Sequence, residues 1–218
     1  MIEDGVYRIP LTLSISLEPQ RQVLEEMIVN AQMRVKSFAA KHGWLDLISE
    51  PFAEAADIYD SKYDFDRAAI HLMQLPQATQ MPEKAVACLE NGVLMTVAPH
   101  IYSQVYPEGI EANSFEKLMA HEIAHRLHVR ILGGNEDAMG PIWFFEGFAI
   151  YAASQFENST LELGDSEIWE VVRGTERIGY EKYAAAFRHF AGKSSNLSDL
   201  VKMAGTQDFE AFLRRIDR

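Results

Sequence analysis

The sequence of 218 residues predicts an α+β fold in a single domain, residues 1–218. First, residues 1–132 alternate strand-like and helix-like patterns and contain one clear hairpin signal. Second, residues 133–218 show helical patterns throughout. Third, 48% hydrophobic and 24% charged residues are ordinary for a globular chain that is long enough to bury a substantial core. We therefore expect a small N-terminal lobe with a mixed sheet and helices, followed by an all-helical C-terminal lobe.

One strand and one long helix are predicted at the N-terminus. Apolar residues alternate over residues 6–17, which is the period of a strand with one buried face. An apolar helical stripe then extends from Pro19 to about Lys41, where His42 and Gly43 supply a stop signal. Both elements are expected to serve as scaffold.

The stretch that follows this helix has a weaker pattern. Residues 53–60 predict a short strand that ends at Tyr59. Residues 60–84, which include Pro76 and Pro82, show no clear periodicity and are expected to be mostly loop.

The clearest turn signal in the chain is Asn91-Gly92, which separates two apolar runs at residues 86–90 and 93–98. Asn-Gly favours the type I′ turn, whose twist matches that of the two strands it joins. The pattern therefore predicts a β-hairpin, one strand of which is a candidate sheet edge.

A helix that carries two histidines and a glutamate follows the hairpin, in the segment HEIAH. Positions i and i+4 of a helix lie nearly above one another, so His121 and His125 can direct their ring nitrogens at one metal ion. Glu122 is then placed to reach a water molecule in an open coordination position, as a general base does. The bare pattern also occurs by coincidence on amphipathic helices, so a third ligand is needed to support a metal site.

The limits of this helix are marked by its neighbours in the sequence. Asn113 to Glu116 offer a capping box, and an apolar stripe continues from Phe115 to Ile131. Gly133-Gly134 is then expected to stop the helix.

Residues 141–154 form an almost wholly apolar run in which Glu146 is the only charged residue. A helix that is apolar on all sides is expected to be buried. A buried, ionised carboxylate is costly unless it is paired or coordinates a metal, so Glu146 requires a cation. A metal ion would supply that charge. The alternatives are a buried salt bridge to Arg126 or Arg130, or a helix turned so that Glu146 is exposed.

The remainder of the chain is predicted to be helical, without internal repeats or low-complexity segments. A polar loop follows the apolar helix, and four further amphipathic patterns are bounded by glycines or capping residues. These predicted helices cover residues 165–172, 179–191, 197–204 and 207–216.

Charge and cysteine content exclude some classes of partner. The chain has 32 acidic and 20 basic residues and a formal net charge of -12, which argues against nucleic acid or an anionic membrane surface as the main partner. No stretch is long enough to span a membrane and the N-terminus lacks a signal-peptide pattern, so a cytoplasmic location is expected unless an export signal has been removed. Cys88 is the only cysteine and is expected to be a small buried group. Nothing in the sequence indicates a particular oligomeric state.

HEIAH, followed 21 residues after His125 by Glu146 in WFFEGFAIY, resembles the gluzincins. These zinc metallopeptidases carry HExxH on one helix and a glutamate ligand on the next, and the pattern here is similar to the thermolysin-like and aminopeptidase N-like branch. The resemblance covers roughly residues 85–192 and implies a thermolysin-like (zincin) catalytic domain. It implies Zn²⁺ held by His121, His125 and Glu146, with Glu122 as the catalytic base and a peptide or protein as the substrate.

Two further features of that family have counterparts in this chain. Tyr180-Glu181-Lys182 resembles the segment in which a tyrosine hydroxyl steadies the oxyanion, which makes Tyr180 a candidate catalytic residue. Tyr183, which stands where the family has glycine, is the alternative. The resemblance also implies that an edge strand of the hairpin binds the substrate backbone by strand addition, although a plain structural hairpin is equally compatible with the pattern.

Two other histidines lie close to these motifs in the sequence. His128 is three residues beyond His125, so its ring would overshoot the shared ion, and we interpret it as a residue that packs in the core or contacts one of the ligands. His100 is interpreted as a surface histidine. The sequence thus predicts a zinc-dependent peptidase. A zinc hydrolase of a non-peptide bond and a zinc-stabilised, non-catalytic binding module remain alternatives, and nickel, copper or cobalt can occupy the same ligands.

Overall fold

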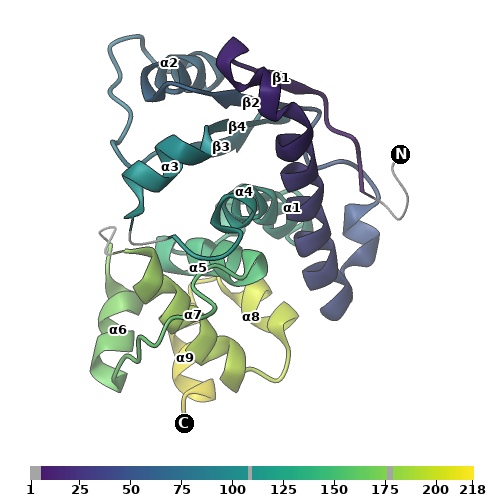
Figure 1. Cartoon of the computed structure of the whole chain (residues 1–218). Helices are drawn as coiled ribbons and strands as arrows, with labels where there is room; N and C mark the ends of the chain where they lie inside the picture. The colour runs from purple at the N-terminus through teal and green to yellow at the C-terminus, as the bar shows by residue number, and fades with distance from the viewer. Residues whose placement is uncertain (1–5, 108–109, 176–178) are drawn as a thin grey trace.

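The computed structural model describes residues 6–107, 110–175 and 179–218 (Figure 1). Within these ranges the fold is α+β, as predicted: a small mixed sheet lies at one end of the molecule and helices make up the rest. The strands are β1 (Leu11–Leu13), β2 (Ala55–Tyr59), β3 (Ala87–Glu90) and β4 (Val93–Val97). The α-helices are α1 (Arg21–Lys41), α2 (Lys62–Leu72), α3 (Pro99–Val105), α4 (Ser114–Ile131), α5 (Ile142–Ala153), α6 (Asp165–Arg173), α7 (Tyr180–Lys193), α8 (Leu197–Met203) and α9 (Phe209–Ile216).

The sheet has the strand order β1-β2-β4-β3. β1, β2 and β4 run parallel, and β3 pairs antiparallel with β4, so β3 forms one edge of the sheet. The predicted hairpin is confirmed: Asn91 and Gly92 both have positive φ, 48° and 76°, as a type I′ turn requires. β4 is central and almost fully buried, which explains why its sequence, VLMTV, is nearly all apolar.

The first strand is shorter than the alternating pattern predicts. Only Leu11–Leu13 pair with β2, because Pro10 has no N–H to donate and contributes only its carbonyl, which accepts from the Ala56 N–H at 2.9 Å. Ile15–Gln20 then form a 3-10 helix that contains Pro19, and α1 begins two residues after this proline. The predicted end of α1 is confirmed by Gly43, whose φ is 77°.

The prediction of loop over residues 60–84 is wrong for the part that forms α2. The Ser61 hydroxyl accepts a hydrogen bond from the Asp64 N–H at 3.3 Å, which caps the first turn of this helix. Phe65 and Ala69, four residues apart on one face, are fully buried. The predicted strand within residues 53–60 is confirmed as β2.

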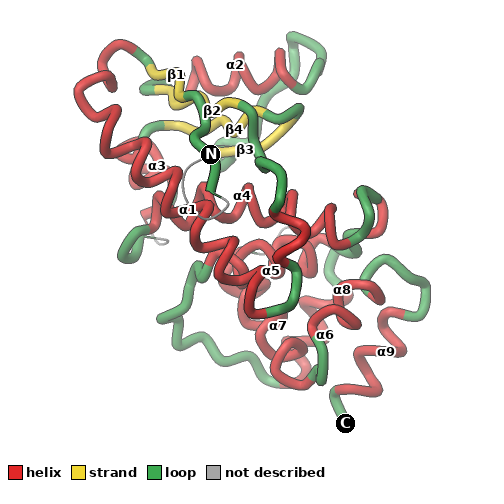
Figure 2. Tube along the Cα trace, turned by 90° about the vertical axis from the view of Figure 1, so that its right-hand side faces the viewer, coloured by secondary structure: helices red, strands yellow, loops and turns green. Residues whose placement is uncertain are grey.

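The elements are stacked in layers, which Figures 1 and 2 show from two directions. α2 covers one face of the sheet, and α4 lies against the other face with α1 beside it. α5 packs beneath α4, and α7 packs against α5, with α6, α8 and α9 outermost. The four predicted C-terminal helices are thus confirmed as α6 to α9, with ends that differ by one to a few residues. α4 and α5 are therefore the two innermost helices.

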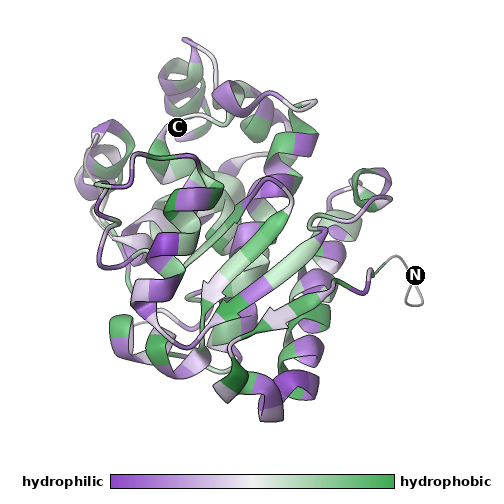
Figure 3. Ribbon diagram, turned by 90° about the horizontal axis from the view of Figure 1, so that it is seen from above, coloured by the Kyte–Doolittle hydropathy of each residue, from purple (hydrophilic) through white to green (hydrophobic). Residues whose placement is uncertain are grey.

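A single hydrophobic cluster runs from the sheet through α4 and α5 to the C-terminal helices. Apolar residues predominate along much of the sheet in the view from above (Figure 3). Trp143, Phe144 and Phe148 on α5 are completely buried, so the predicted burial of this apolar helix is confirmed. No helix in the described part of the chain has both the length and the apolar character needed to cross a lipid bilayer.

The ends of α4 agree with the sequence prediction, but its predicted capping box does not form. Asn113 has a positive φ of 58° and makes no side-chain capping bond. Glu116 instead accepts a hydrogen bond from the Asn30 side chain of α1, at 3.0 Å. Gly133 and Gly134 both have positive φ directly after the helix, as expected of a glycine stop.

Substitution of Gly147 by alanine is expected to lower the free energy of unfolding by about 1–3 kcal/mol through overpacking. A methyl group there would lie 2.7 Å from Phe187 Cβ and 3.1 Å from the Tyr183 carbonyl oxygen, where α5 meets α7. Urea denaturation measures the change. The matched control is Gly192→Ala on α7, which meets no atom within 4 Å and should raise stability by up to about 1 kcal/mol. Equal free energies of unfolding for the two variants would contradict the close approach of α5 and α7 at Gly147.

Candidate metal centre

The three predicted ligand residues come together between α4 and α5. His121 and His125 lie one helical turn apart on α4, and Glu146 approaches them from α5. The Nε2 atoms of the two histidines are 3.0 Å apart. Glu146 Oε2 lies 3.2 Å from His121 Nε2 and 3.8 Å from His125 Nε2. In the described part of the chain, these residues form a group able to hold a metal ion.

The spacing of these three atoms fits a tetrahedral metal ion. Two ligand atoms at about 2.0–2.1 Å from one tetrahedral zinc ion lie roughly 3.3–3.4 Å apart. The separations of 3.0, 3.2 and 3.8 Å scatter around that value. A point about 2.0 Å from all three atoms exists close to their plane, and this is an ordinary distance from zinc to its ligands. Two imidazoles and one carboxylate form a donor set that suits zinc and other divalent transition metals.

Glu146 is buried, with 4% of its surface exposed, which rules out the alternative of an outward-facing side chain. The predicted arginine partners are also engaged elsewhere. Arg126 pairs with Glu136 at 2.6 Å. Arg130 donates to backbone carbonyls of residues 47, 50 and 51 at 2.6–2.9 Å. Among the described residues, His121 and His125 lie within 4 Å of the Glu146 carboxylate and can supply positive charge, either when protonated or through an ion that they hold.

The electrostatics of His121 indicate that this position favours a cation. Burial lowers the pKa of His121, but the hydrogen bond to Glu146 and the charges of Glu122 and Glu146 outweigh burial and raise the pKa above its usual value. A proton on the imidazole and a metal ion between the three ligands satisfy the same buried carboxylate. The site is thus built to hold positive charge.

Gln155 fixes the orientation of the His121 ring, and sequence reasoning missed this residue. His121 Nδ1 lies 2.9 Å from the Gln155 side-chain oxygen, which can only accept a hydrogen bond. This contact favours a proton on Nδ1, so in the neutral ring Nε2 would carry the lone pair that faces Glu146 and His125. Outer partners of this kind hold a metal-binding histidine in one tautomer and one ring position. The contact joins residues 34 positions apart, and no local pattern in the sequence marks it.

Glu122 lies next to the ligands and near the edge strand β3. Its side chain is half-buried, and α4 packs against β3. Burial, together with the charges of Glu122 and Glu90, raises the pKa of the half-buried Cys88 thiol on β3 to about 12. The edge strand therefore borders the metal centre on the side of Glu122.

Tyr180, rather than Tyr183, lies beside the ligands. Tyr180 is the first residue of α7, is half-buried, and its ring centre is 6.0 Å from that of His121. Tyr106 stands next to it, with ring centres 6.3 Å apart. Tyr183 is only 2% exposed and belongs to the hydrophobic core. Of the two tyrosines, Tyr180 is thus the one that is half-buried next to His121.

His128 and His100, the two other histidines close to the motifs in the sequence, lie outside the ligand group, as the sequence predicts. His128 is fully buried, with its ring 4.4 Å from that of Phe148, so its predicted packing role is confirmed. Burial lowers the pKa of His128 to about 3 and keeps the ring neutral. His100 is exposed on α3, as expected of a surface histidine.

The groups assembled here are two imidazoles and a buried carboxylate, with a second carboxylate and a phenol close to them. These residues belong to α4, α5 and α7, and α4 packs against the edge strand β3. No protein-family model, no curated protein and no solved structure matches the chain. The function of the chain is therefore inferred from these groups themselves.

Proposed function

We propose that the chain is a zinc-dependent peptidase of the gluzincin type, with a thermolysin-like catalytic domain. The observation that carries the proposal is the approach of the His121, His125 and Glu146 ligand atoms to within 3.0–3.8 Å of one another. Glu122 adds a carboxylate on the same turn of α4, where a general base is needed. Catalytic zinc sites typically use three protein ligands and keep one position open, which agrees with this donor set.

Each residue near the site has a distinct task in the proposed reaction. A bound zinc ion would polarise the scissile carbonyl and make a water molecule more acidic. Glu122 accepts the proton of the attacking water and delivers it to the departing amine nitrogen. The Tyr180 hydroxyl donates a hydrogen bond to the oxygen that becomes negative in the tetrahedral intermediate. Gln155 keeps the His121 ring oriented throughout.

β3 offers a surface on which an extended substrate can be aligned. It is the edge strand of the sheet and borders Glu122, so one row of its backbone groups faces away from β4. A peptide that adds to such an edge gains main-chain hydrogen bonds regardless of its sequence. We include β3 in the proposal as the binding strand that presents the scissile bond to Glu122.

A digest of a peptide library by the zinc-loaded protein, read by mass spectrometry, tests the proposal. Defined cleavage sites that disappear on chelation and return with zinc are expected. Parallel ester substrates separate the competing functions: turnover of esters alone would favour a zinc hydrolase of non-peptide bonds. Stoichiometric zinc without turnover of either substrate would favour a non-catalytic binding module. Metal analysis of protein purified without added zinc identifies the ion that the chain retains.

Tyr180→Phe is expected to lower kcat on the order of 100-fold, with little change in KM, because one oxyanion donor is removed. Zinc content and stability should be retained, since Tyr180 is half-buried at the start of a helix. Tyr183→Phe is the comparison, because Tyr183 is one turn further along α7 and lies in the core. Steady-state kinetics of both variants decide the assignment. A large loss of kcat in Tyr183→Phe alone would transfer the role to that residue.

A further inference from the structure

The turn that follows α5 holds Gln155 in an unusual backbone setting. Ser154 and Phe156, on either side of Gln155, both have positive φ, 56° and 53°. Residues other than glycine and asparagine rarely adopt positive φ, so surrounding contacts have to maintain this backbone conformation. The turn places the Gln155 side-chain oxygen 2.9 Å from His121 Nδ1.

Several contacts hold this turn, which we define as residues 154–157. The Gln155 N–H donates to the Ile150 carbonyl at 3.0 Å. The Phe156 N–H donates to Glu111 Oε1 at 3.0 Å, and the Phe156 carbonyl accepts from Arg188 at 2.9 Å. The side chains of Glu111 and Arg188 thus both form hydrogen bonds with the backbone of Phe156, the residue next to Gln155.

Lys117 joins these contacts to the helix that carries the ligands. Its side chain is almost fully buried, at 1% exposure for the residue. Its Nζ donates to Glu157 Oε1 at 2.8 Å and lies 3.1 Å from Glu111 Oε2. Lys117 therefore fixes both the end of the turn and the carboxylate that binds Phe156. It also precedes His121 by four residues, so both side chains emerge on the same face of α4.

From these contacts we propose that Lys117 is a positioning residue for the metal ligand His121. Its ammonium group holds the 154–157 turn, the turn holds the Gln155 oxygen, and that oxygen keeps the His121 proton on Nδ1. The lone pair on Nε2 is then directed at the metal position. This inference rests on the proposed metal centre and extends it to a residue that does not touch the ion.

A purely stabilising ion pair is the alternative explanation for Lys117. Buried ion pairs often add little stability over apolar groups of similar size, so stability alone is a weak reason for this arrangement. The link through the turn to Gln155 predicts a different consequence, which is that loss of Lys117 weakens metal binding more than it weakens the fold.

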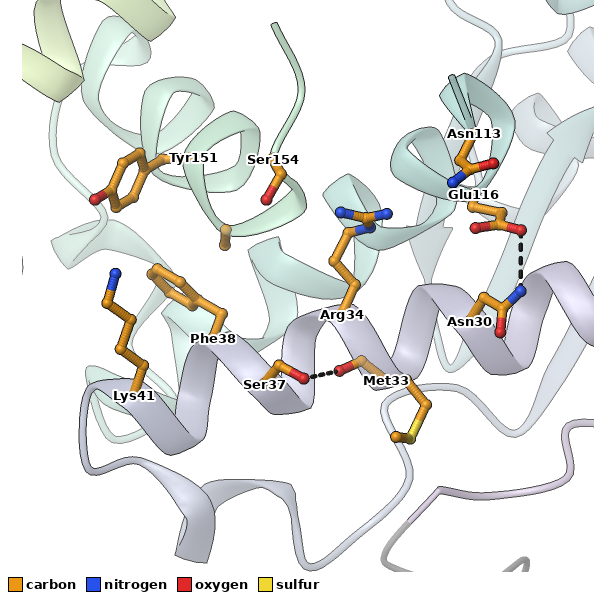
Figure 4. A pocket seen from close by; sticks show the side chains of 11 residues that line it. Asn30, Met33, Arg34, Ser37, Phe38, Lys41, Asn113, Glu116, Tyr151 and Ser154 are labelled. Atoms are coloured by element: carbon orange, nitrogen blue, oxygen red, sulfur yellow. Dashed lines mark hydrogen bonds between the residues drawn. The ribbon is translucent and has the colours of Figure 1, made fainter. Parts of the chain in front are cut away.

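The surroundings of the turn suggest that the fold tolerates this loss. Ser154 lines a pocket of about 680 Å³ between α1, the start of α4 and the end of α5, to which none of the proposed ligands belongs. Arg34 projects from α1 into this pocket (Figure 4). The hydrogen bond from Lys117 lowers the pKa of Glu157, and the charge of Arg34 lowers it further. The Glu157 side chain is also half-exposed, so its carboxylate can stay ionised when Lys117 is replaced.

The test compares zinc affinities, measured by chelator competition, of Lys117→Met, Gln155→Met and the double variant. Each single variant should bind zinc about 10–100-fold more weakly, as for loss of an outer partner of a ligand. The double variant should lose no more than one single variant, because both changes act through the same contact. Lys117→Arg should restore most of the affinity. Lys62→Met, which breaks the Lys62–Asp66 pair on α2, is the matched control and should leave zinc affinity unchanged.

Unchanged zinc affinity in a folded Lys117→Met variant would overturn the proposal. So would losses that add up in the double variant, because Lys117 would then act independently of Gln155. If Lys117→Met does not fold, Glu157→Ala removes the acceptor of the Lys117 hydrogen bond from a half-exposed side chain, and unchanged zinc affinity in that variant also overturns the proposal.

A metal-free measurement separates this inference from the proposed function. Nitrogen-15 NMR at alkaline pH reports which nitrogen of the neutral His121 ring carries the proton. Because Nε2 also faces the Glu146 carboxylate, we expect the Nδ1–H tautomer to make up a larger fraction in the wild type than in Lys117→Met. Absence of zinc binding in the wild type would remove the proposed function, yet this tautomer shift would still support the positioning role. Identical spectra of the two proteins would refute it.

Discussion

Glu122→Gln is expected to retain zinc and the native fold while it loses turnover by about 10²–10⁴-fold, the usual contribution of a general base. Glutamine has almost the same shape as glutamate but cannot accept the proton of the attacking water. Glu122 is half-buried beside the ligands, so the substitution should leave the packing of α4 unchanged. Steady-state peptide cleavage and metal analysis of the same preparation measure the two effects.

A matched control for this variant exists on the same helix. Glu116→Gln also removes one negative charge from α4, and its amide oxygen can still accept the hydrogen bond from Asn30. This control should cleave peptides at the wild-type rate. Loss of zinc from Glu122→Gln would assign Glu122 to the structure of the metal centre, and equal activity of the two variants would remove it from the reaction.

Glu146→Ala is expected to reduce zinc affinity by more than the roughly 10–100-fold that loss of an outer partner costs. Two histidines would remain, fewer than the three protein ligands that catalytic zinc sites use. Chelator competition and the zinc content after dialysis measure the loss.

The control for Glu146→Ala is Glu136→Ala, which removes an exposed carboxylate paired with Arg126 on α4. An exposed ion pair contributes little, so this variant should keep its zinc and most of its stability. Unchanged zinc stoichiometry in Glu146→Ala would show that Glu146 is not a ligand. Reduced zinc content in both variants would show that the loss of one negative charge, rather than the loss of a ligand, weakens zinc binding.

The groups that converge at the metal centre were predictable because their signals are local. The spacing of His121 and His125 follows from one helical turn, and Glu146 stands out because every neighbour in its helix is apolar. An apolar stripe with end signals predicts the histidine helix, and a continuous apolar run predicts the buried helix that carries Glu146. The hairpin was predictable for the same reason, since Asn91-Gly92 specifies the turn without any distant contact.

The parts that sequence reasoning missed depend on contacts between distant residues. Lys117 reads as a surface lysine on an amphipathic helix, yet its partner Glu157 is 40 positions away. Gln155 reaches His121 only through a turn in which two residues have positive φ. Neither of these residues is a glycine, so the sequence does not indicate the turn. α2 is a different case, because the capping residue Ser61 is a local signal. Pro76 and Pro82 lie beyond the end of α2, yet they led to the prediction of loop for the whole segment.

The burial of Cys88 on β3 and the nearby charge of Glu122 keep its thiol in the neutral form. A thiolate is a strong zinc ligand and the form of cysteine that reacts with oxidants. With the pKa of Cys88 raised to about 12, only on the order of one thiol in 10⁵ is ionised at neutral pH. Cys88 is therefore a poorly nucleophilic thiol, and among the described residues it does not belong to the group of candidate metal ligands.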